Sequence, residues 1–307
     1  MWTRGRFANE YVPGLFAIAV DSYEKKRAMS MWNELVTVGN SKKAKEEDAI
    51  RSGLDSMAEK GEGAPVTFDT QIAGPKQSWV PTVWAKACRI TEEAIEDNLY
   101  ELNGGSDGNL KELFYDLGEI AEENIEVRIA RFFNSGTATT YHTTRFSKAL
   151  FATDHTMLNG DSYSNLATSA DLTYLTFWAN LVAAENQYNH QGHKITQVVK
   201  SLWFPPQLEQ KAIEVIKSTD RPDTGNRAIN AYAKSGRSIA LKKWSQMTDT
   251  DMWVLQKEGR GIKFFWNRKT RFARDKDFLT GDMSVKVDQR WSCEIADEQC
   301  FYGNVPS

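Results

Sequence analysis

The sequence predicts an α+β fold, because helical and strand patterns occupy separate stretches of the 307-residue chain. The longest pattern is helical and runs from Asn109 to Asn134, with apolar residues at three- and four-residue steps. At a rise of 1.5 Å per residue this helix would be ~40 Å long, about the width of a small domain. Two runs rich in β-branched and aromatic residues, 65–72 and 78–90, precede it, and strand patterns dominate after residue 238.

Residues 1–61 begin with an aromatic arm that has little periodicity. Trp2, Phe7 and Tyr11 are its largest side chains, and left in water they would form a sizeable apolar patch. We therefore expect the arm to lie either on its own chain or on a neighbouring copy. A helical pattern follows at Ser22–Val38, and then a stretch rich in lysine and glutamate.

Residues 62–91 predict a long β-hairpin. The turn signal Ala73–Gln77 separates the two strand runs, and at ~3.3 Å per residue the ribbon would extend roughly 30 Å. Pro81 within the second run requires an edge position or a bulge. Because a two-stranded hairpin is marginally stable in water, Trp79 and Trp84 need cover from a larger sheet of the same chain or from another molecule.

The region from residue 92 to residue 169 contains two predicted helices. The shorter spans Thr91–Leu102 and ends before a Gly-Gly pair. The longer one is acidic outside its apolar stripe, and we expect carboxylates such as Glu122 and Glu123 to be solvated. Arg128 falls on the line of the apolar stripe, which indicates a polar contact at the far end of the helix.

Residues 170–250 read as a compact α/β unit, and residues 251–307 as terminal strands. The predicted elements are helices at Asp171–Gln187 and Gln207–Ser218, and strands at Gln197–Phe204, Ser238–Lys243, Met252–Gln256, Ile262–Trp266 and Met283–Ile295. The last strand alternates, which places Val285, Val287, Gln289, Trp291 and Cys293 on one face.

Charge is segregated along the chain, although the formal net charge is only −3. Residues 92–126 carry twelve acidic residues and one basic residue, whereas residues 234–276 carry twelve basic and four acidic ones. Such blocks are either ordinary solvated faces or surfaces on which two copies meet. A nucleic-acid-binding module around Lys234–Lys276 is disfavoured, because its interleaved aromatic residues fit strand cores better.

The cysteines and the N-terminal sequence favour a soluble product made in a cytoplasm. Cys88, Cys293 and Cys300 are odd in number and lack CxxC spacing, which indicates reduced thiols. No apolar segment of signal-peptide type follows the first basic residues, and Leu15–Val20 is too short to span a bilayer. We expect no membrane association.

No residue pattern in the sequence predicts catalysis, a cofactor site or a metal site. His190 and His193 are three residues apart in a loop-like segment without a spaced acidic or cysteine partner for zinc. His142 and His155 lie in polar stretches, where hydrogen-bonding roles are expected. Nucleophile-elbow and phosphate-binding glycine motifs are absent. The prediction is a non-enzymatic protein without cofactors, and an α+β enzyme with an unrecognised motif remains the alternative from another class.

The order of elements and three stretches of sequence resemble a known family. The stretches are Leu150–Gly160, Leu202–Ala212, and Gly261–Trp266 together with Cys300–Gly303. They resemble the major capsid proteins of tailed bacteriophages, most closely the Mu-type major head subunit. The resemblance covers residues 63–303.

This resemblance implies the tailed-phage major capsid (Hong Kong-type) fold. Its parts would be an N-terminal arm and helix, an extended β-hairpin loop, a peripheral domain with a long spine helix, an axial α/β domain, and terminal strands that return to the peripheral domain. The corresponding residues would be 1–61, 62–91, 92–169, 170–250 and 251–307.

The resemblance also implies a function and partners. The subunit would assemble as hexamers and pentamers into an icosahedral virion shell that encloses phage double-stranded DNA, in the host cytoplasm, with scaffold, portal and decoration proteins as further partners. An encapsulin-like compartment is an alternative within the same architecture. We expect these residues of the hairpin and arm to contact neighbouring subunits: Phe68, Lys76, Trp79, Val83, Trp84, Trp2, Phe7 and Tyr11.

Overall fold

The computed structural model describes residues 12–54, 57–71, 73–92, 110–168, 171–220, 228–259 and 261–305. The chain divides into two compact units. The first unit comprises Met1–Lys45, Val80–Ile129 and Phe264–Cys293, and the second comprises Glu46–Trp79, Ala130–Lys263 and Glu294–Ser307. We describe each unit by itself.

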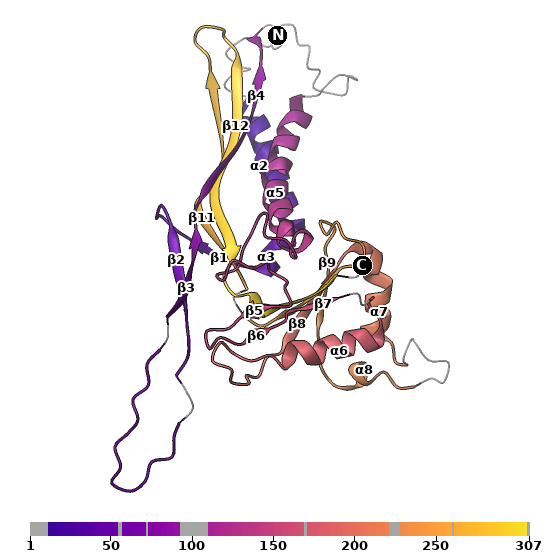
Figure 1. Ribbon diagram of the computed structural model, residues 1–307. Helices are drawn as coiled ribbons and strands as arrows, with labels where there is room; N and C mark the ends of the chain where they lie inside the picture. Colours follow the sequence, from indigo (N-terminus) through magenta and orange to yellow (C-terminus); the bar gives the residue numbers. More distant parts are fainter. Residues whose placement is uncertain are drawn as a thin grey trace. The chain divides into compact units, whose positions relative to one another are not determined.

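A four-stranded sheet forms one layer of the first unit, in the order β1-β11-β12-β4. Figure 1 shows β11 and β12 as a long hairpin with β4 beside it. The bounds of the strands are β1 Val36–Asn40, β4 Thr82–Ile90, β11 Ile262–Lys276 and β12 Met283–Ile295. The predicted strand Met283–Ile295 is confirmed, and the five residues expected on one face are all buried.

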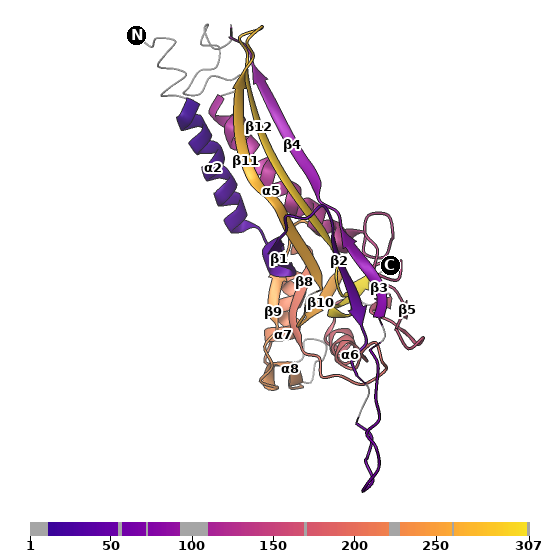
Figure 2. The same ribbon diagram turned by 90° about the vertical axis from the view of Figure 1, so that its left-hand side faces the viewer.

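Two helices, α2 (Val12–Met29) and α5 (Leu110–Asn134), pack with this sheet, as Figure 2 shows for α2. The long helix expected from residue 109 to residue 134 is therefore confirmed. The helices approach closely at Gly118, where a Cβ atom would overlap the carbonyl oxygen of Ala19. The hydroxyl of Ser22 donates to the backbone oxygens of Ala19 and Tyr115, at 3.0 and 2.9 Å. Glycine is thus required where α2 crosses α5.

The expectation that Glu122 is solvated is wrong, because its side chain is fully buried. Its Oε1 atom accepts hydrogen bonds from Trp32 Nε1 at 2.5 Å and from Ser30 Oγ at 2.9 Å. Burial raises the pKa of the Glu122 carboxyl, and the two hydrogen bonds partly oppose that shift. This carboxyl fixes the turn that follows α2, and the neighbouring Glu126 accepts from the backbone N–H of Met31 at 3.2 Å.

The helix expected at Ser22–Val38 is also wrong in its second half. The helix α2 ends at Met29, the short α3 spans Trp32–Leu35, and Val36–Asn40 is the edge strand β1 beside β11. The β-branched residues in Val36-Thr37-Val38 suit a pleated strand. Because β11 offers a pairing partner, this segment forms a strand instead of continuing as a helix. The helix expected at Thr91–Leu102 lies outside the described residues beyond position 92.

The second unit is built on a five-stranded mixed sheet in the order β7-β13-β10-β8-β9. The strand β10 pairs antiparallel with both β8 and β13, whereas β7 and β9 run parallel to their neighbours. The bounds are β7 Leu166–Thr168, β8 Val199–Phe204, β9 Ala240–Lys243, β10 Trp253–Lys257 and β13 Phe301–Val305. A small hairpin, β5 (His155–Thr156) with β6 (Ser162–Tyr163), accompanies the sheet.

Both faces of this sheet are buried. Leu202 and Phe204 of β8 pack in one cluster with α6 (Tyr174–Glu185), α7 (Glu209–Lys217) and α8 (Ala231–Lys234). Trp203 points to the opposite face, since neighbouring strand residues alternate, and it meets the C-terminal turn of α5. There Phe133 contacts four aromatic rings with centroids 5.8–6.3 Å away, those of Phe151, Trp203, Trp244 and Phe301.

The predicted helices and strands of residues 170–250 are found within a few residues of their expected bounds. The destination of the terminal strands was partly wrong. Only β11 and β12 join the sheet of the first unit, whereas β10 and β13 lie at the centre of the five-stranded sheet. A strand pattern does not predict which sheet the strand joins, because its pairing partners can be far away in the sequence.

Replacing Phe133 with alanine is expected to lower the free energy of unfolding by about 3–5 kcal/mol, the usual effect of removing a buried phenylalanine side chain. Urea unfolding of the isolated subunit measures it. The matched control is Phe278→Ala, whose side chain is 98% exposed and whose loss should change stability little. Equal effects of the two substitutions would show that the aromatic cluster is not a core.

Glu122→Gln should change how stability depends on pH. The raised pKa means that the folded state binds more protons than the unfolded state between the unfolded and folded pKa values, so stability falls as pH rises through that window. The substituted chain lacks this loss, so its stability relative to that of the wild type should rise from pH 4 to pH 8. Urea midpoints measured across that range, with the exposed Glu123→Gln as control, test this; a pH-independent difference would contradict it.

Candidate functional site

The extended ribbon of this chain is formed by β2 (Glu46–Arg51) and β3 (Ala73–Trp79), not by the predicted hairpin. The expected turn Ala73–Gln77 is part of β3, and the second predicted run is divided at Val80–Pro81 into β3 and β4. The strand β4 pairs with β12, from Thr82 opposite Trp291 to Ile90 opposite Met283.

Two physical reasons explain the error. Pro81 has no N–H and interrupts the ladder, so the strand run could not continue through it. The Gly74-Pro75 signal marks a close approach rather than a turn, because a Cβ at Gly74 would overlap Ile50 and Leu158. Proline is tolerated next to that glycine, since β2 and β3 form a two-stranded sheet in which both strands are edges.

Residues 57–71, which we call the open loop, connect the ribbon strands without regular structure, and every one of them is exposed. In Figure 1 the loop extends beyond the ends of β2 and β3. Its apolar side chains include Phe68 at 97% exposure and Met57, which is fully exposed. A large aromatic group held in water on an extended segment is typical of a surface that meets another molecule.

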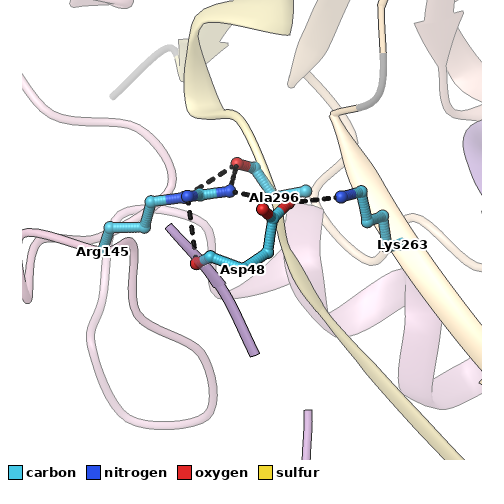
Figure 3. A network of polar contacts seen from close by, with 4 residues as sticks. All are labelled: Asp48, Arg145, Lys263 and Ala296. Carbon is cyan, nitrogen blue, oxygen red and sulfur yellow. Dashed lines mark hydrogen bonds and ion pairs between the residues drawn. The ribbon is translucent and has the colours of Figure 1, made fainter. Parts of the chain in front are cut away.

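An ion-pair cluster holds the base of the open loop (Figure 3). Asp48 of β2 lies between two cations, with Lys263 Nζ 2.5 Å and Arg145 Nη2 3.5 Å from its Oδ2 atom. Arg145 also donates from Nη1 to the backbone oxygen of Asp48, at 3.2 Å, and from Nε and Nη2 to the backbone oxygen of Ala296, at 3.1 and 2.8 Å. The cluster therefore joins β2 to two distant segments of the second unit.

Burial strengthens this cluster. The Arg145 side chain is only 5% exposed, so its guanidinium needs the acceptors that Asp48 and Ala296 provide. The hydrogen bond from Lys263, together with the charges of Lys263 and Arg145, lowers the pKa of the Asp48 carboxyl. Lys263 Nζ also lies 5.5 Å from the centre of the Trp79 ring, which places a cation–π contact on β3.

Further hydrogen bonds join the ribbon to the body of the second unit. Gln77 Nε2 donates to the backbone oxygen of Thr143 at 3.2 Å, and Gln191 Nε2 donates to that of Gly53 at 2.6 Å. These two hydrogen bonds hold the segments that flank the open loop, one on each side of it.

The residues predicted to contact neighbouring subunits fall into three groups. Phe68, Lys76 and Val83 are exposed, and Lys76 forms a 3.8 Å ion pair with Glu47. Trp84 is half-buried, with the Arg128 guanidinium 3.4 Å from its ring centre and the Trp291 ring 5.8 Å away. The third group, Trp2, Phe7 and Tyr11, lies outside the described residues.

The contact predicted for Trp79 does not fit the structure, because its side chain is only 1% exposed in the single copy and is not available to a neighbouring subunit. It points inward from β3 toward Lys263, on the same ribbon whose Lys76 side chain is exposed. No sequence pattern indicated that Asp48, Arg145 and Lys263 form a cluster, because they are far apart in the chain and each has the pattern of an ordinary solvated charge.

The histidines and cysteines have structural surroundings. His155 is buried, with its Nε2 atom 3.0 Å from Asn165 Oδ1 and 3.3 Å from the backbone oxygen of Leu150, as expected for a hydrogen-bonding histidine. His142 Nδ1 lies 3.2 Å from a carboxylate oxygen of Glu294. Within the described residues, Cys88, Cys293 and Cys300 form no disulfide. Within the described ranges, no group of histidine, cysteine and acidic residues could hold a metal ion.

None of the helices in the described part of the chain is long and apolar enough to cross a lipid bilayer.

Solved structures resemble this chain, although no family model and no curated protein matches it. The capsid of Myoviridae phage XM1 matches with 10% identity, 88% coverage of each chain and a TM-score of 0.52. The capsid of cyanophage P-SCSP1u matches with 11% identity, 91% coverage of this chain, 88% of the other and a TM-score of 0.56. A virus-like particle from Pyrococcus furiosus matches with 10% identity, 96% and 100% coverage and a TM-score of 0.54.

These likenesses define the class of fold. The chain has the α+β, Hong Kong-type fold found in tailed-phage capsids, and this prediction is confirmed. The likeness to the Mu-type head subunit in particular stays a prediction.

Asp48→Asn should loosen the ribbon base while leaving the five-stranded sheet intact, because it removes the charge that holds Lys263 and Arg145. Hydrogen–deuterium exchange should become faster at residues 46–51 and 73–79 and stay unchanged in β8 and β10. The matched control is Glu47→Gln, which lies next to Asp48 on β2 and removes an exposed, 3.8 Å pair with Lys76. Unchanged protection of β2 and β3 in Asp48→Asn would rule out an anchoring role for the cluster.

Proposed function

We propose that this chain is a major capsid protein, which self-assembles into the icosahedral head of a tailed phage around double-stranded DNA. The observation that carries the proposal is the open loop: a chain with a capsid fold holds a fully exposed segment, with Phe68 in water, on a firmly anchored base. The role is structural rather than catalytic.

Residues 57–71 have no secondary structure and no buried side chain in the single copy. A neighbouring subunit that covers them gains apolar contact area that the isolated subunit lacks. Obligate interfaces bury roughly 2,000–5,000 Å² in total, and extended elements that lie across a neighbour help to reach such areas. Assembly is then favoured over the isolated subunit.

Hexamers and pentamers of the chain would form the shell, in the host cytoplasm, with scaffold, portal and decoration proteins as additional partners. Contact with packaged DNA would be non-specific and carried by basic side chains on phosphates. The net charge of −3 suits a protein that forms a container around DNA better than a dedicated DNA-binding protein, which would carry excess positive charge.

A specific observation favours a second candidate, a protein compartment that encloses protein cargo. An encapsulin complex of Synechococcus elongatus also matches, with 8% identity, 88% coverage of this chain, 85% of the other and a TM-score of 0.50. Particles produced in the phage's host and treated externally with nuclease distinguish the two: protected double-stranded DNA supports the phage head, and protein cargo without DNA supports the compartment.

Replacing residues 57–71 with a short glycine-serine linker should abolish shell formation without unfolding the subunit, because the open loop buries nothing within its own chain. Electron microscopy and light scattering of the purified proteins measure assembly, and circular dichroism with thermal unfolding verifies the fold. The control is Ala64→Ser, which keeps the length and apolar side chains of the open loop. Closed shells of normal size from the linker variant would contradict the proposal.

A further inference from the structure

A groove of about 250 Å³ opens in the first unit between α5 and the strands β4 and β12. Its apolar wall includes Trp84, Ile120 and Val287, and Ile120 is 43% exposed although it lies beside a hydrophobic surface. The charged side chains that line it are Lys86 and Arg128, and none of the described lining residues is acidic. The groove is therefore apolar with a positive rim.

Two hydrogen-bond donors beside this groove are unsatisfied. Trp84 Nε1 and Asn124 Nδ2 are both buried, and neither has an acceptor within the described part of the chain. The Arg128 guanidinium covers them, since it lies 3.4 Å from the Trp84 ring centre and its Nε donates to Asn124 Oδ1 at 3.0 Å. Buried donors are normally paired in folded proteins, so an acceptor brought by a second molecule would satisfy these two.

The open loop has the complementary chemistry. Phe68 is its most exposed aromatic side chain, and Asp69 follows directly. Residues 57–71 carry three carboxylates and one lysine, so the loop is acidic where the groove is basic. An aromatic ring next to a carboxylate fits an apolar wall with a cationic rim, because the ring removes apolar area from water and the carboxylate meets both the cations and the unsatisfied donors.

We propose that the groove of one copy receives Phe68 from the open loop of a second copy, with Asp69 facing Lys86 and Arg128. This inference rests on the proposed shell function and names the residues on both sides of one subunit contact. The Phe68 ring lies against Trp84 and Ile120. The Asp69 carboxylate draws the Arg128 head group toward itself, and acceptor oxygens of the incoming loop become available to Trp84 Nε1 and Asn124 Nδ2.

Cross-linking between two differently labelled chains tests the contact. One chain carries Phe68→Cys, the other carries Ile120→Cys, and both carry Cys88→Ser because that partly buried thiol lies on β4 near the groove. The two chains are co-assembled, mildly oxidised, and separated on a non-reducing gel. A dimer band is expected in the mixture, several-fold stronger than in a control mixture that combines Met57→Cys with Ile120→Cys.

Charge reversal gives an independent readout if the cysteine variants assemble poorly. Asp69→Lys should reduce shell yield, and Lys86→Glu in the same chain should restore it, because the reversed charges attract again. Asp69→Lys combined with Glu119→Lys, a reversal on α5 outside the groove lining, is the control and should not restore the yield.

The outcomes separate this inference from the function on which it rests. Normal shells without the cross-link, or without rescue by Lys86→Glu, overturn the proposed contact and leave the shell function standing. A cross-link that forms within one chain carrying both cysteines, and never between two chains, also overturns it. Wild-type protein that forms no shell under any condition overturns both.

Discussion

The structure depends on a constraint that one chain does not satisfy alone: Phe68 and its neighbours are held in water on a loop whose ends are fixed. Apolar side chains on a freely moving segment can collapse onto nearby surface. Here the strands on both sides of the loop are paired with each other and hydrogen-bonded to other segments of the second unit, so the ribbon from which the loop extends is held in place. In the shell that we propose, the surface that covers the open loop belongs to a second copy, whose groove is complementary to it.

The anchoring of the ribbon base shows how charge can specify position. Surface ion pairs contribute little to stability when they are isolated and solvated. The pairs around Asp48 differ, because the Arg145 guanidinium is almost completely buried and donates to backbone oxygens of two segments. Removing the Asp48 carboxylate takes an acceptor from the buried Arg145 guanidinium, and this loss is greater than the net gain from forming the pair. Such a cluster suits an element that must present the same geometry in every copy.

Much of the fold could be predicted from the sequence wherever local periodicity decides structure. The helix α5 and the strand β12 were predicted because their apolar residues repeat with clear periods of about 3.6 and 2 residues. The ribbon could not be predicted in the same way. One of its strands, β2, begins with the charged residues Glu46-Glu47-Asp48, which do not resemble a strand pattern. The open loop at its tip has no periodicity. Only the glycines at 61 and 63 and the proline at 65 indicated a loop there.

The candidate site was harder to predict than the fold, because its residues come together from distant parts of the chain. Phe68, Val83 and Lys76 were expected at the surface and are exposed, but Trp79 was assigned to an interface although it is buried under Lys263. Burial of Glu122 depends on Trp32, 90 residues earlier, and no local pattern carries that information.

Hydrogen–deuterium exchange of the wild-type chain, compared between dissociated subunits and purified particles, tests most directly whether the open loop is covered by a sister copy. Amides of residues 57–71 should exchange rapidly in the dissociated subunit and be strongly protected in the particle. Equally rapid exchange in both states would contradict the account, since the exposed loop would then have no neighbour to cover it.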